Sequence, residues 1–556
     1  MTEWSLHDKK TGKKISPLRY SNGKTQEKVV EEILDALKHD RIVLFRGGVG
    51  TGKSVVALHI VREYGFGNIV VPTKVLEKQY YEDYTNRFYI NGLNIKYFMG
   101  KNNYRCKFFN KSVPCGHRMC PCSCPLDKGQ KRLDVAKQCP HYSPVVSKKI
   151  SKKVVEILRD EHGHDYEINY YNSFRGSEAH ILSPIPCEYY STFNVYTDKR
   201  PHATVFNLAK WEIESWIGRK AVVPVEIIDE GDLFLDELTY KVSISENTIE
   251  SIKNEGLVPK ENVMEFERKF REIISIVRSY YNVLGYNDYI IELLNTFLDT
   301  MQGVSTSGRV CQMVERVRLI LRYQYESWCV VKKRRVTVYI PRPDITLKNL
   351  MKRCGKLVLM SATFQPQDVL REIYGIDPPI IEGETRFPGL LKLRVTGKEV
   401  YVNNRNWESH EFKNRYWRLL NKMIDRSSKP TLVQVHAYRY VPDGIDVNKE
   451  NPDVWWSTVS DRGLDLRDDK CRSIVVLKYP YPDLNDPVLK TMERVLKGKF
   501  WKYYEDKARR ELIQQIGRGL RSKHDWVEVW SPDRRVTRTV PKIWRGQLQV
   551  ERVKID

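Results

Sequence analysis

Apolar and polar positions alternate along much of the chain in the order that parallel α/β domains require. A helical pattern over residues 26–37 precedes a short apolar run at 42–45, a Gly-rich turn and a second helical stretch from about Ser54. Further apolar runs of strand length lie at 69–71, 203–206, 225–228, 357–360, 431–435 and 473–477. Short buried strands that alternate with helices are typical of parallel sheets, so the fold class predicted here is α/β.

Two stretches interrupt this alternation. Residues 101–200 are rich in Cys, Tyr and Lys and have few long periodic segments. Residues 260–325 are strongly helical, because Val263, Phe266, Phe270 and Val277 fall at helical spacing. We expect both stretches to be insertions into the first α/β domain.

The charge of the chain points to a polyanionic partner. The 556 residues include 93 Lys and Arg against 70 Asp and Glu, a net charge of +23. Residues 101–160 alone hold 14 basic and 4 acidic residues. No apolar run is long enough to cross a membrane, and the first residues lack the apolar segment of a secretory signal. We expect a cytoplasmic protein without a membrane partner.

A phosphate-binding loop follows the first apolar run. The segment Gly47-Gly48-Val49-Gly50-Thr51-Gly52-Lys53-Ser54 fits the pattern G-x-x-x-x-G-K-[ST] between a strand and a helix. Its amides would cradle phosphate oxygens, Lys53 would reach the β and γ phosphates, and Ser54 would hold Mg²⁺. The nucleotide-binding residues expected in this loop are Gly47, Gly50, Thr51, Gly52, Lys53 and Ser54.

A pair of carboxylates ends another apolar run. Asp229 and Glu230 directly follow residues 225–228. Hydrolysis of ATP needs an acid for Mg²⁺ and a group that orients the attacking water. We expect Asp229 to hold Mg²⁺ and Glu230 to orient the attacking water.

Four further segments follow in a characteristic order. They are residues 69–79, beginning IVVPTKVL; residues 356–363, KLVLMSAT; residues 457–466, STVSDRGLDL; and residues 514–521, QQIGRGLR. In this order they resemble motifs Ia, III, V and VI of superfamily-two helicases, and 431–436 resembles motif IV. Residues 100–106, 187–190 and 465–483 narrow the resemblance to the XPD/DinG group of iron–sulfur DNA helicases.

The resemblance implies an architecture of two RecA-like motor domains with a Cys-rich and an arch-like helical insertion. The first motor domain would comprise 1–100, 201–240 and 346–385, and the second 386–556. The iron–sulfur insertion would span 101–200 and the arch 241–345.

The resemblance also implies roles for single residues. In motif VI, Gln514, Arg518 and Arg521 would act on the γ-phosphate, and the two arginines lie about one helical turn apart. Gln26, Gly463 and Asp465 would join the nucleotide site. Two positions depart from the pattern: Asp232 ends a box that usually reads DEAH, and Arg462 stands where motif V usually has Glu. These two departures cast doubt on the coupling of ATP hydrolysis to movement more than on hydrolysis itself.

Seven of the eleven cysteines are candidate metal ligands. We assign a [4Fe–4S] cluster to Cys106, Cys120, Cys124 and Cys187, with Cys139, Cys115 and Cys122 as alternates. The rival cofactor is zinc, because Cys115, His117, Cys120, Cys122 and Cys124 have suitable donors. Basic and aromatic residues interleave around these cysteines, a composition that suits a single nucleic-acid strand.

These features predict an ATP- and Mg²⁺-dependent DNA helicase that moves along single-stranded DNA, with 5′-to-3′ polarity implied by the resemblance alone. Forked or tailed DNA duplexes are the expected substrates, and RNA is kept as an alternative substrate. We expect the protein to be a monomer. The alternatives are a DNA-stimulated translocase that does not unwind, and a single-strand-binding protein whose motor is inactive.

Overall fold

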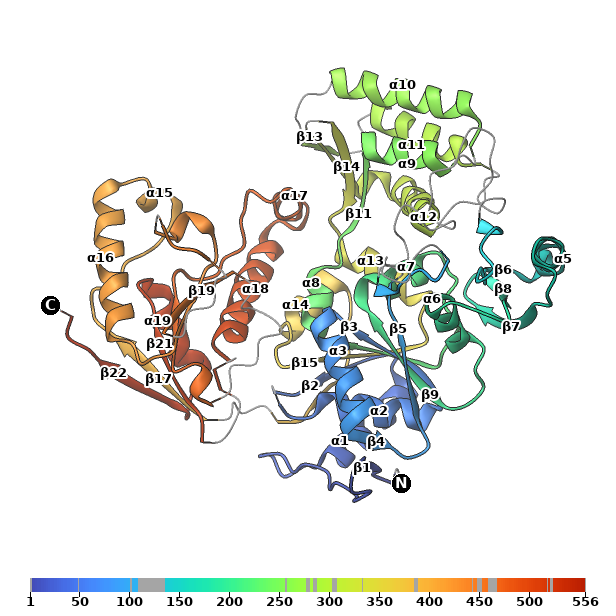
Figure 1. Cartoon of the computed structure of the whole chain (residues 1–556). Coiled ribbons are helices and arrows are strands. Elements are labelled where there is room, and N and C mark those ends of the chain that lie inside the picture. Colours follow the sequence, from blue (N-terminus) through green and yellow to red (C-terminus); the bar gives the residue numbers. More distant parts are fainter. Residues whose placement is uncertain are drawn as a thin grey trace.

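The computed structural model describes residues 3–48, 50–100, 103–108, 136–255, 258–276, 281–283, 288–302, 308–332, 334–384, 389–442, 444–447, 453–458, 468–517, 519–520 and 524–555. Two lobes, each built on a parallel sheet, lie side by side, and two smaller subdomains extend from one of them (Figure 1). The predicted α/β class with two RecA-like domains is therefore confirmed.

The first lobe contains a seven-stranded sheet in which every pair of neighbours is parallel. Its order is β16 (Ile380–Glu382), β2 (Ile42–Arg46), β15 (Lys356–Ser361), β10 (Val225–Asp229), β3 (Phe66–Val71), β9 (His202–Asn207) and β5 (Asn94–Phe98). Its helices include α1 (Gln26–His39), α2 (Lys53–Tyr64), α3 (Lys74–Glu82), α7 (Leu208–Trp216), α8 (Gly231–Asp236), α13 (Pro343–Met351) and α14 (Gln367–Tyr374). A two-stranded sheet of β1 (Leu6–Asp8) and β4 (Phe88–Ile90) lies beside it.

The second lobe contains a six-stranded parallel sheet. Its order is β19 (Val454–Ser457), β18 (Thr431–Gln434), β20 (Ser473–Val476), β21 (Trp526–Trp530), β17 (Leu390–Val395) and β22 (Leu548–Arg552). Its helices are α15 (Asn404–Trp407), α16 (His410–Arg426), α17 (Pro487–Leu496), α18 (Gly498–Gly517) and α19 (Arg534–Ile543). Among the described residues no helix is both long and apolar enough to span a bilayer.

The inner strands of the first sheet are buried on both faces, which is why their sequences read as nearly continuous apolar runs. Val43, Ile227 and Val358 face the core formed with α1 and α2. Leu44 and Ile228, one residue along, face the opposite core. Because successive side chains of a strand point to opposite faces of the sheet, neighbouring residues pack against different layers of helices.

In its described part, the Cys-rich insertion is a small subdomain with one antiparallel sheet. An antiparallel sheet of β6 (Val145–Ser147), β8 (Gly176–Leu182) and β7 (Glu167–Ser173) packs against α5 (Ser151–His162). The short helix α6 (Glu188–Ser191) leads back to the first lobe.

The arch-like insertion is helical as predicted, but it also contains a sheet that the sequence did not indicate. Its helices are α9 (Glu246–Glu255), α10 (Lys260–Ile276), α11 (Asp288–Thr300) and α12 (Gly308–Arg322). An antiparallel sheet lies beneath them, in the order β11 (Tyr240–Ser245), β14 (Arg335–Ile340), β13 (Trp328–Lys332) and β12 (Tyr281–Val283) (Figure 1). The pairing of β11 with β14 joins segments about 95 residues apart, a contact that local periodicity cannot reveal.

Helix α18 belongs to two hydrophobic cores. Leu512 and Ile516, toward its C-terminal end, pack in the core of the second lobe. Phe500 and Tyr503, toward its N-terminal end, pack in a core shared with the first lobe and the arch. The helix is therefore anchored to both halves of the molecule.

A buried carboxylate lies in the middle of the first sheet. Glu226 of β10 is fully buried, accepts hydrogen bonds from Trp211 (2.6 Å) and Asn68 (3.1 Å), and forms an ion pair with the fully buried Lys220. A buried ion pair contributes little net stability while it is intact, but removing one partner leaves the other charged group without compensation.

Replacing one member of this pair should destabilise the first lobe. Glu226→Leu leaves Lys220 buried and unpaired, and we expect the free energy of unfolding to fall by about 3–5 kcal/mol, measured by urea denaturation. The double variant Glu226→Leu/Lys220→Met removes both charges and should recover most of that loss. A Glu226→Leu protein as stable as the wild type would contradict this role.

Candidate nucleotide site and interdomain contact

The phosphate-binding loop joins β2 to α2, as predicted. Gly50 and Gly52 have φ values of 75° and 72°, in the left-handed region that favours glycine. A side chain at Gly52 would collide with the amide of Gln26. The loop backbone therefore depends on glycine at these positions.

Lys53 is held by the loop itself. Its ammonium donates to the carbonyl oxygens of Gly47 (3.1 Å) and Gly48 (3.2 Å), and the Thr51 hydroxyl donates to Gly48 (2.7 Å). These contacts keep the positive charge at the mouth of the loop, where a triphosphate would lie in an ATP-binding protein of this kind.

Gln26 stabilises the loop through hydrogen bonds of its side chain. Its side-chain oxygen accepts from the Leu18 amide (2.8 Å), and its nitrogen donates to the Thr51 carbonyl (3.1 Å). The Tyr20 hydroxyl donates to the same carbonyl (3.1 Å). Gln26 was predicted to bind nucleotide, and it lies at the loop, while the sequence did not single out Tyr20.

The carboxylate pair ends β10, as predicted. Asp229 is 7% exposed, and burial raises its pKa to about 6, although the nearby Lys53 opposes the shift. Glu230 has a φ of 54°, an uncommon left-handed conformation for a residue other than glycine, at the start of α8. Because β2 and β10 both pair with β15, Asp229 and the phosphate-binding loop lie at the same carboxyl edge of the sheet.

A tyrosine not predicted from the sequence contacts Ser54. The Tyr84 hydroxyl donates to Ser54 Oγ at 3.0 Å, and burial raises the pKa of Tyr84 above its ordinary value. Tyr84 lies in the π-helical turn Asp83–Arg87 directly after α3. The predicted magnesium ligand is thus joined to the turn that follows the motif Ia segment.

Asp232, the departure from the DEAH pattern, is fully buried and hydrogen-bonded. Ser361 donates to Asp232 Oδ1 (2.7 Å) and Thr363 donates to Oδ2 (3.0 Å). The Ser361 carbonyl in turn accepts from the Gly47 amide (3.0 Å) in the phosphate-binding loop. Asp232 therefore connects the loop to motif III.

The residues around Asp232 also contact the second lobe, through α18. The Gln514 side chain donates to Thr363 Oγ1 at 3.0 Å. Arg510 is 2% exposed, makes a two-point contact with Asp236 (2.8 and 3.0 Å) and lies 3.5 Å from Asp232. Its Nε donates to Asp506 at 2.7 Å.

The electrostatics of this cluster favour the charged forms. Burial alone would raise the pKa of Asp236, yet Arg510 and Lys507 lower it below its ordinary value. Burial likewise opposes the charge on Arg510, while Asp236 and Asp506 raise its pKa well above the usual value. We refer to Asp232, Asp236, Asp506 and Arg510 as the interdomain ion cluster.

Other predicted site residues fall outside the described residues. They are Arg518, Arg521, Gly463, Asp465, Cys115, Cys120, Cys122 and Cys124. Arg462, the second departure from the family pattern, lies there too.

Three candidate metal ligands are described. Cys106, Cys139 and Cys187 are 5–7% exposed. The segments that carry them meet through ring contacts of Tyr104 with Tyr189 (5.8 Å) and of Tyr142 with Tyr190 (5.6 Å). Within the described part of the chain, no group of three or more His, Cys, Asp or Glu forms a metal site.

Comparisons with known proteins agree with this arrangement. The model of a helicase C-terminal domain matches residues 402–548, and the model of the Type III restriction enzyme res subunit matches residues 19–136. No curated protein sequence matches the chain. A solved XPD helicase aligns over 95% of this chain and 99% of its own length, with a TM-score of 0.56 at 17% identity.

The chain has the fold of the XPD helicases. An XPD structure without ligand aligns with a TM-score of 0.51 at 15% identity, and an XPD protein of S. tokodaii with 0.53 at 14%. Each covers 95% of this chain and 99% of its own length. The resemblance to XPD/DinG-type superfamily-two helicases is thus confirmed as a likeness of fold.

The sequence held one unused signal for the interdomain ion cluster. Asp506, Arg510 and Gln514 recur every four residues, so they share one face of α18. That face carries the predicted motif VI residue Gln514. A charged stripe in register with a motif residue could have indicated a buried contact with the other lobe.

Removing Arg510 should impair the motor more than removing an exposed cation of the same helix. Arg510→Met leaves Asp232 and Asp236 without their guanidinium, and we expect the ATP turnover rate to fall at least about tenfold. Lys499 of α18 is exposed, so Lys499→Met should stay within about twofold of wild type. The measurement is steady-state ATP hydrolysis with and without single-stranded DNA; equal losses in both variants would refute the assignment.

Proposed function

We propose that this protein is an ATP-dependent DNA helicase that moves along single-stranded DNA in the 5′-to-3′ direction and separates duplex. The observation that carries the proposal is a path of hydrogen bonds and one ion pair from the phosphate-binding loop to α18. It runs from Gly47 through Ser361 and Asp232 to Arg510, with Thr363 and Gln514 as a parallel branch. A motor needs such a path, because hydrolysis at one lobe must change its contact with the other.

Each task in ATP hydrolysis is assigned to particular residues of the two lobes. Lys53 would bind the β and γ phosphates, Ser54 and Asp229 would hold Mg²⁺, and Glu230 would orient the attacking water. Gln514, Arg518 and Arg521 would approach the γ-phosphate from the second lobe. The contact of Gln514 with Thr363 supports this direction of approach.

We further propose that the Cys-rich insertion holds a [4Fe–4S] cluster. Cys106 and Cys187 are assigned as ligands together with Cys120 and Cys124, and Cys139, Cys115 and Cys122 are alternates. Three described candidates are buried thiols on segments that meet through tyrosine rings, and thiolates are the ligands that such a cluster takes. A bound cluster would crosslink the segments that carry its ligands.

The expected track is a single strand of DNA, delivered by a forked or tailed duplex. The net charge of +23 supports a polyanionic partner. The Asp232 contacts favour a working motor over the alternative of an inactive single-strand-binding protein, because the departure from DEAH keeps hydrogen bonds to motif III.

Strand separation should depend on Lys53. We expect the purified protein to unwind a 5′-tailed duplex with ATP and Mg²⁺, and Lys53→Ala to lower the rate at least about a hundredfold by removing the phosphate contact. Lys28→Ala, an exposed lysine of α1, is the matched control and should unwind normally. Unwinding by Lys53→Ala would refute the assigned site, and preference for a 3′ tail would refute the polarity. Hydrolysis without separation would favour the translocase alternative.

Metal content should decide the cofactor. Protein purified without oxygen should contain about four iron atoms and matching acid-labile sulfide per chain, and Cys106→Ser should lose most of the iron. Cys329→Ala is the control, because Cys329 is buried in the arch sheet on β13. Comparison of Cys139→Ser with Cys187→Ser would identify the last ligand. Stoichiometric zinc without iron would overturn the assignment.

A further inference from the structure

A tyrosine hydroxyl contacts the side chain that is assigned to Mg²⁺. Tyr84 is 9% exposed, and its hydroxyl donates to Ser54 Oγ at 3.0 Å. Within the described part of the chain, Ser54 Oγ has no other hydrogen-bond partner. The orientation of the serine hydroxyl therefore depends on Tyr84.

Tyr84 approaches Ser54 from an unusual backbone turn. The π-helical turn Asp83–Arg87 follows α3, and the Phe88 amide closes it by donating to the Asp83 carbonyl. A bond between residues five apart makes the turn wider than an α-helical turn and changes the direction of the side chains within it. Such turns are rare and occur frequently at functional sites.

Packing holds the ring of Tyr84 in place. Tyr84 belongs to the core that the first sheet forms with α1 and α2. Its ring centroid lies 5.9 Å from that of Tyr80 and 6.3 Å from that of Phe88. Burial raises the pKa of Tyr84 above its ordinary value, so the hydroxyl is protonated at neutral pH and can donate. A fixed ring with a protonated hydroxyl can orient the oxygen that it contacts.

A serine hydroxyl can accept from a tyrosine and hold a metal at the same time. Its oxygen has two lone pairs and one hydrogen. Tyr84 occupies one lone pair of Ser54, which leaves the second for Mg²⁺ and the hydrogen for a separate acceptor. Because Mg²⁺ requires nearly ideal octahedral geometry, it should bind more tightly where the ligand is already oriented.

We propose that Tyr84 is a positioning residue of the magnesium site, which orients the Ser54 hydroxyl for Mg²⁺ bound together with a nucleotide. The proposal rests on the proposed function, because it takes Ser54 as the metal ligand. Tyr84 should accordingly affect binding of the metal–nucleotide complex and not binding of the nucleotide alone.

The test measures the Kd of a fluorescent ADP derivative in excess Mg²⁺ and again in EDTA, without DNA. Tyr84→Phe keeps the ring and removes the hydroxyl, so the Kd in Mg²⁺ should rise about tenfold. The Kd in EDTA should stay within about twofold of wild type, because the phosphate-binding loop keeps its own contacts. A rise of equal size in both conditions would show general damage to the loop and overturn the proposal. Tighter binding in Mg²⁺ would also overturn it, because Tyr84 would then compete with the metal for Ser54.

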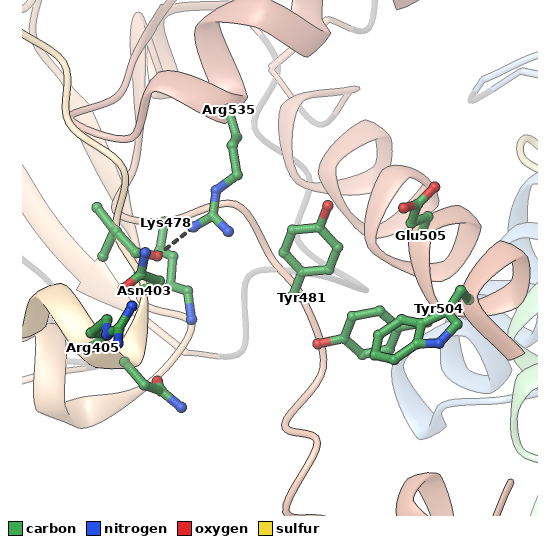
Figure 2. A pocket seen from close by; sticks show the side chains of 10 residues that line it. Asn403, Arg405, Lys478, Tyr481, Tyr504, Glu505 and Arg535 are labelled. Atoms are coloured by element: carbon green, nitrogen blue, oxygen red, sulfur yellow. Dashed lines mark hydrogen bonds between the residues drawn. The ribbon is translucent and has the colours of Figure 1, made fainter. Parts of the chain in front are cut away.

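Tyr504→Phe is the matched control in the second lobe. Tyr504 is 7% exposed, its hydroxyl donates to the Pro482 carbonyl at 2.8 Å, and its ring stacks on Tyr481 (Figure 2). The variant thus loses one hydrogen bond of a buried tyrosine far from the assigned metal ligands in sequence. Both Kd values should match wild type, and a rise in Mg²⁺ as large as that of Tyr84→Phe would overturn the specific role of Tyr84.

A double-variant cycle tests whether Tyr84 acts through Ser54. Ser54→Ala removes the assigned ligand and should by itself raise the Kd in Mg²⁺. Tyr84→Phe should then have no further effect in the Ser54→Ala protein, because there is no hydroxyl left to orient. Losses that add in full would overturn the route through Ser54.

These outcomes are distinct from failure of the proposed function. Wild-type protein that binds no ADP would overturn the nucleotide site itself. Wild-type binding that responds to Mg²⁺ and to Ser54→Ala but not to Tyr84→Phe would overturn only the role of Tyr84.

Discussion

The buried polar contact between the two lobes is centred on one guanidinium. Arg510 of α18 is surrounded by three carboxylates, two from the first lobe and one from its own helix. Each charge would be costly to bury alone, and together they are tolerated only in a geometry that satisfies all of them. The position of α18 against α8 and motif III follows from this constraint.

Such a contact is well suited to a motor because its net strength is small. Charges separated by opening of the lobes would regain water, so the desolvation cost of the closed state offsets most of the attraction. The closed geometry is nevertheless specific, because an incomplete cluster leaves a buried charge unpaired. Nucleotide binding at the loop then needs to supply only a modest free energy to favour one arrangement over the other.

The contacts of Asp232 explain how the chain accommodates its departure from the DEAH pattern. An aspartate at position 232 accepts hydrogen bonds from Ser361 and Thr363 and adds negative charge near Arg510. The sequence motifs suggested a weakened link between ATP and the second lobe. In the structure, an acid and an arginine meet across the interface at this position.

The parts of the fold that follow local rules were predictable. Apolar runs and the Gly-rich turn located β2, β10, β15 and the phosphate-binding loop, because period and turn chemistry are local properties. The arch sheet, the role of Tyr84 and the burial of Glu226 were not predictable, since each depends on a partner far away in sequence. A charged residue inside an apolar run is also read as a solvated position unless its buried partner, here Lys220, is known.

The placement of α18 connects these observations. Its C-terminal half carries Arg510 and Gln514 against the first lobe, and its N-terminal half carries Phe500 and Tyr503 in the core shared with the first lobe and the arch. A helix of 20 residues is a rigid rod of about 30 Å, so displacement at one end must appear at the other. Breaking and re-forming the interdomain ion cluster at one end of α18 would therefore shift the packing of the helix against the arch at its other end.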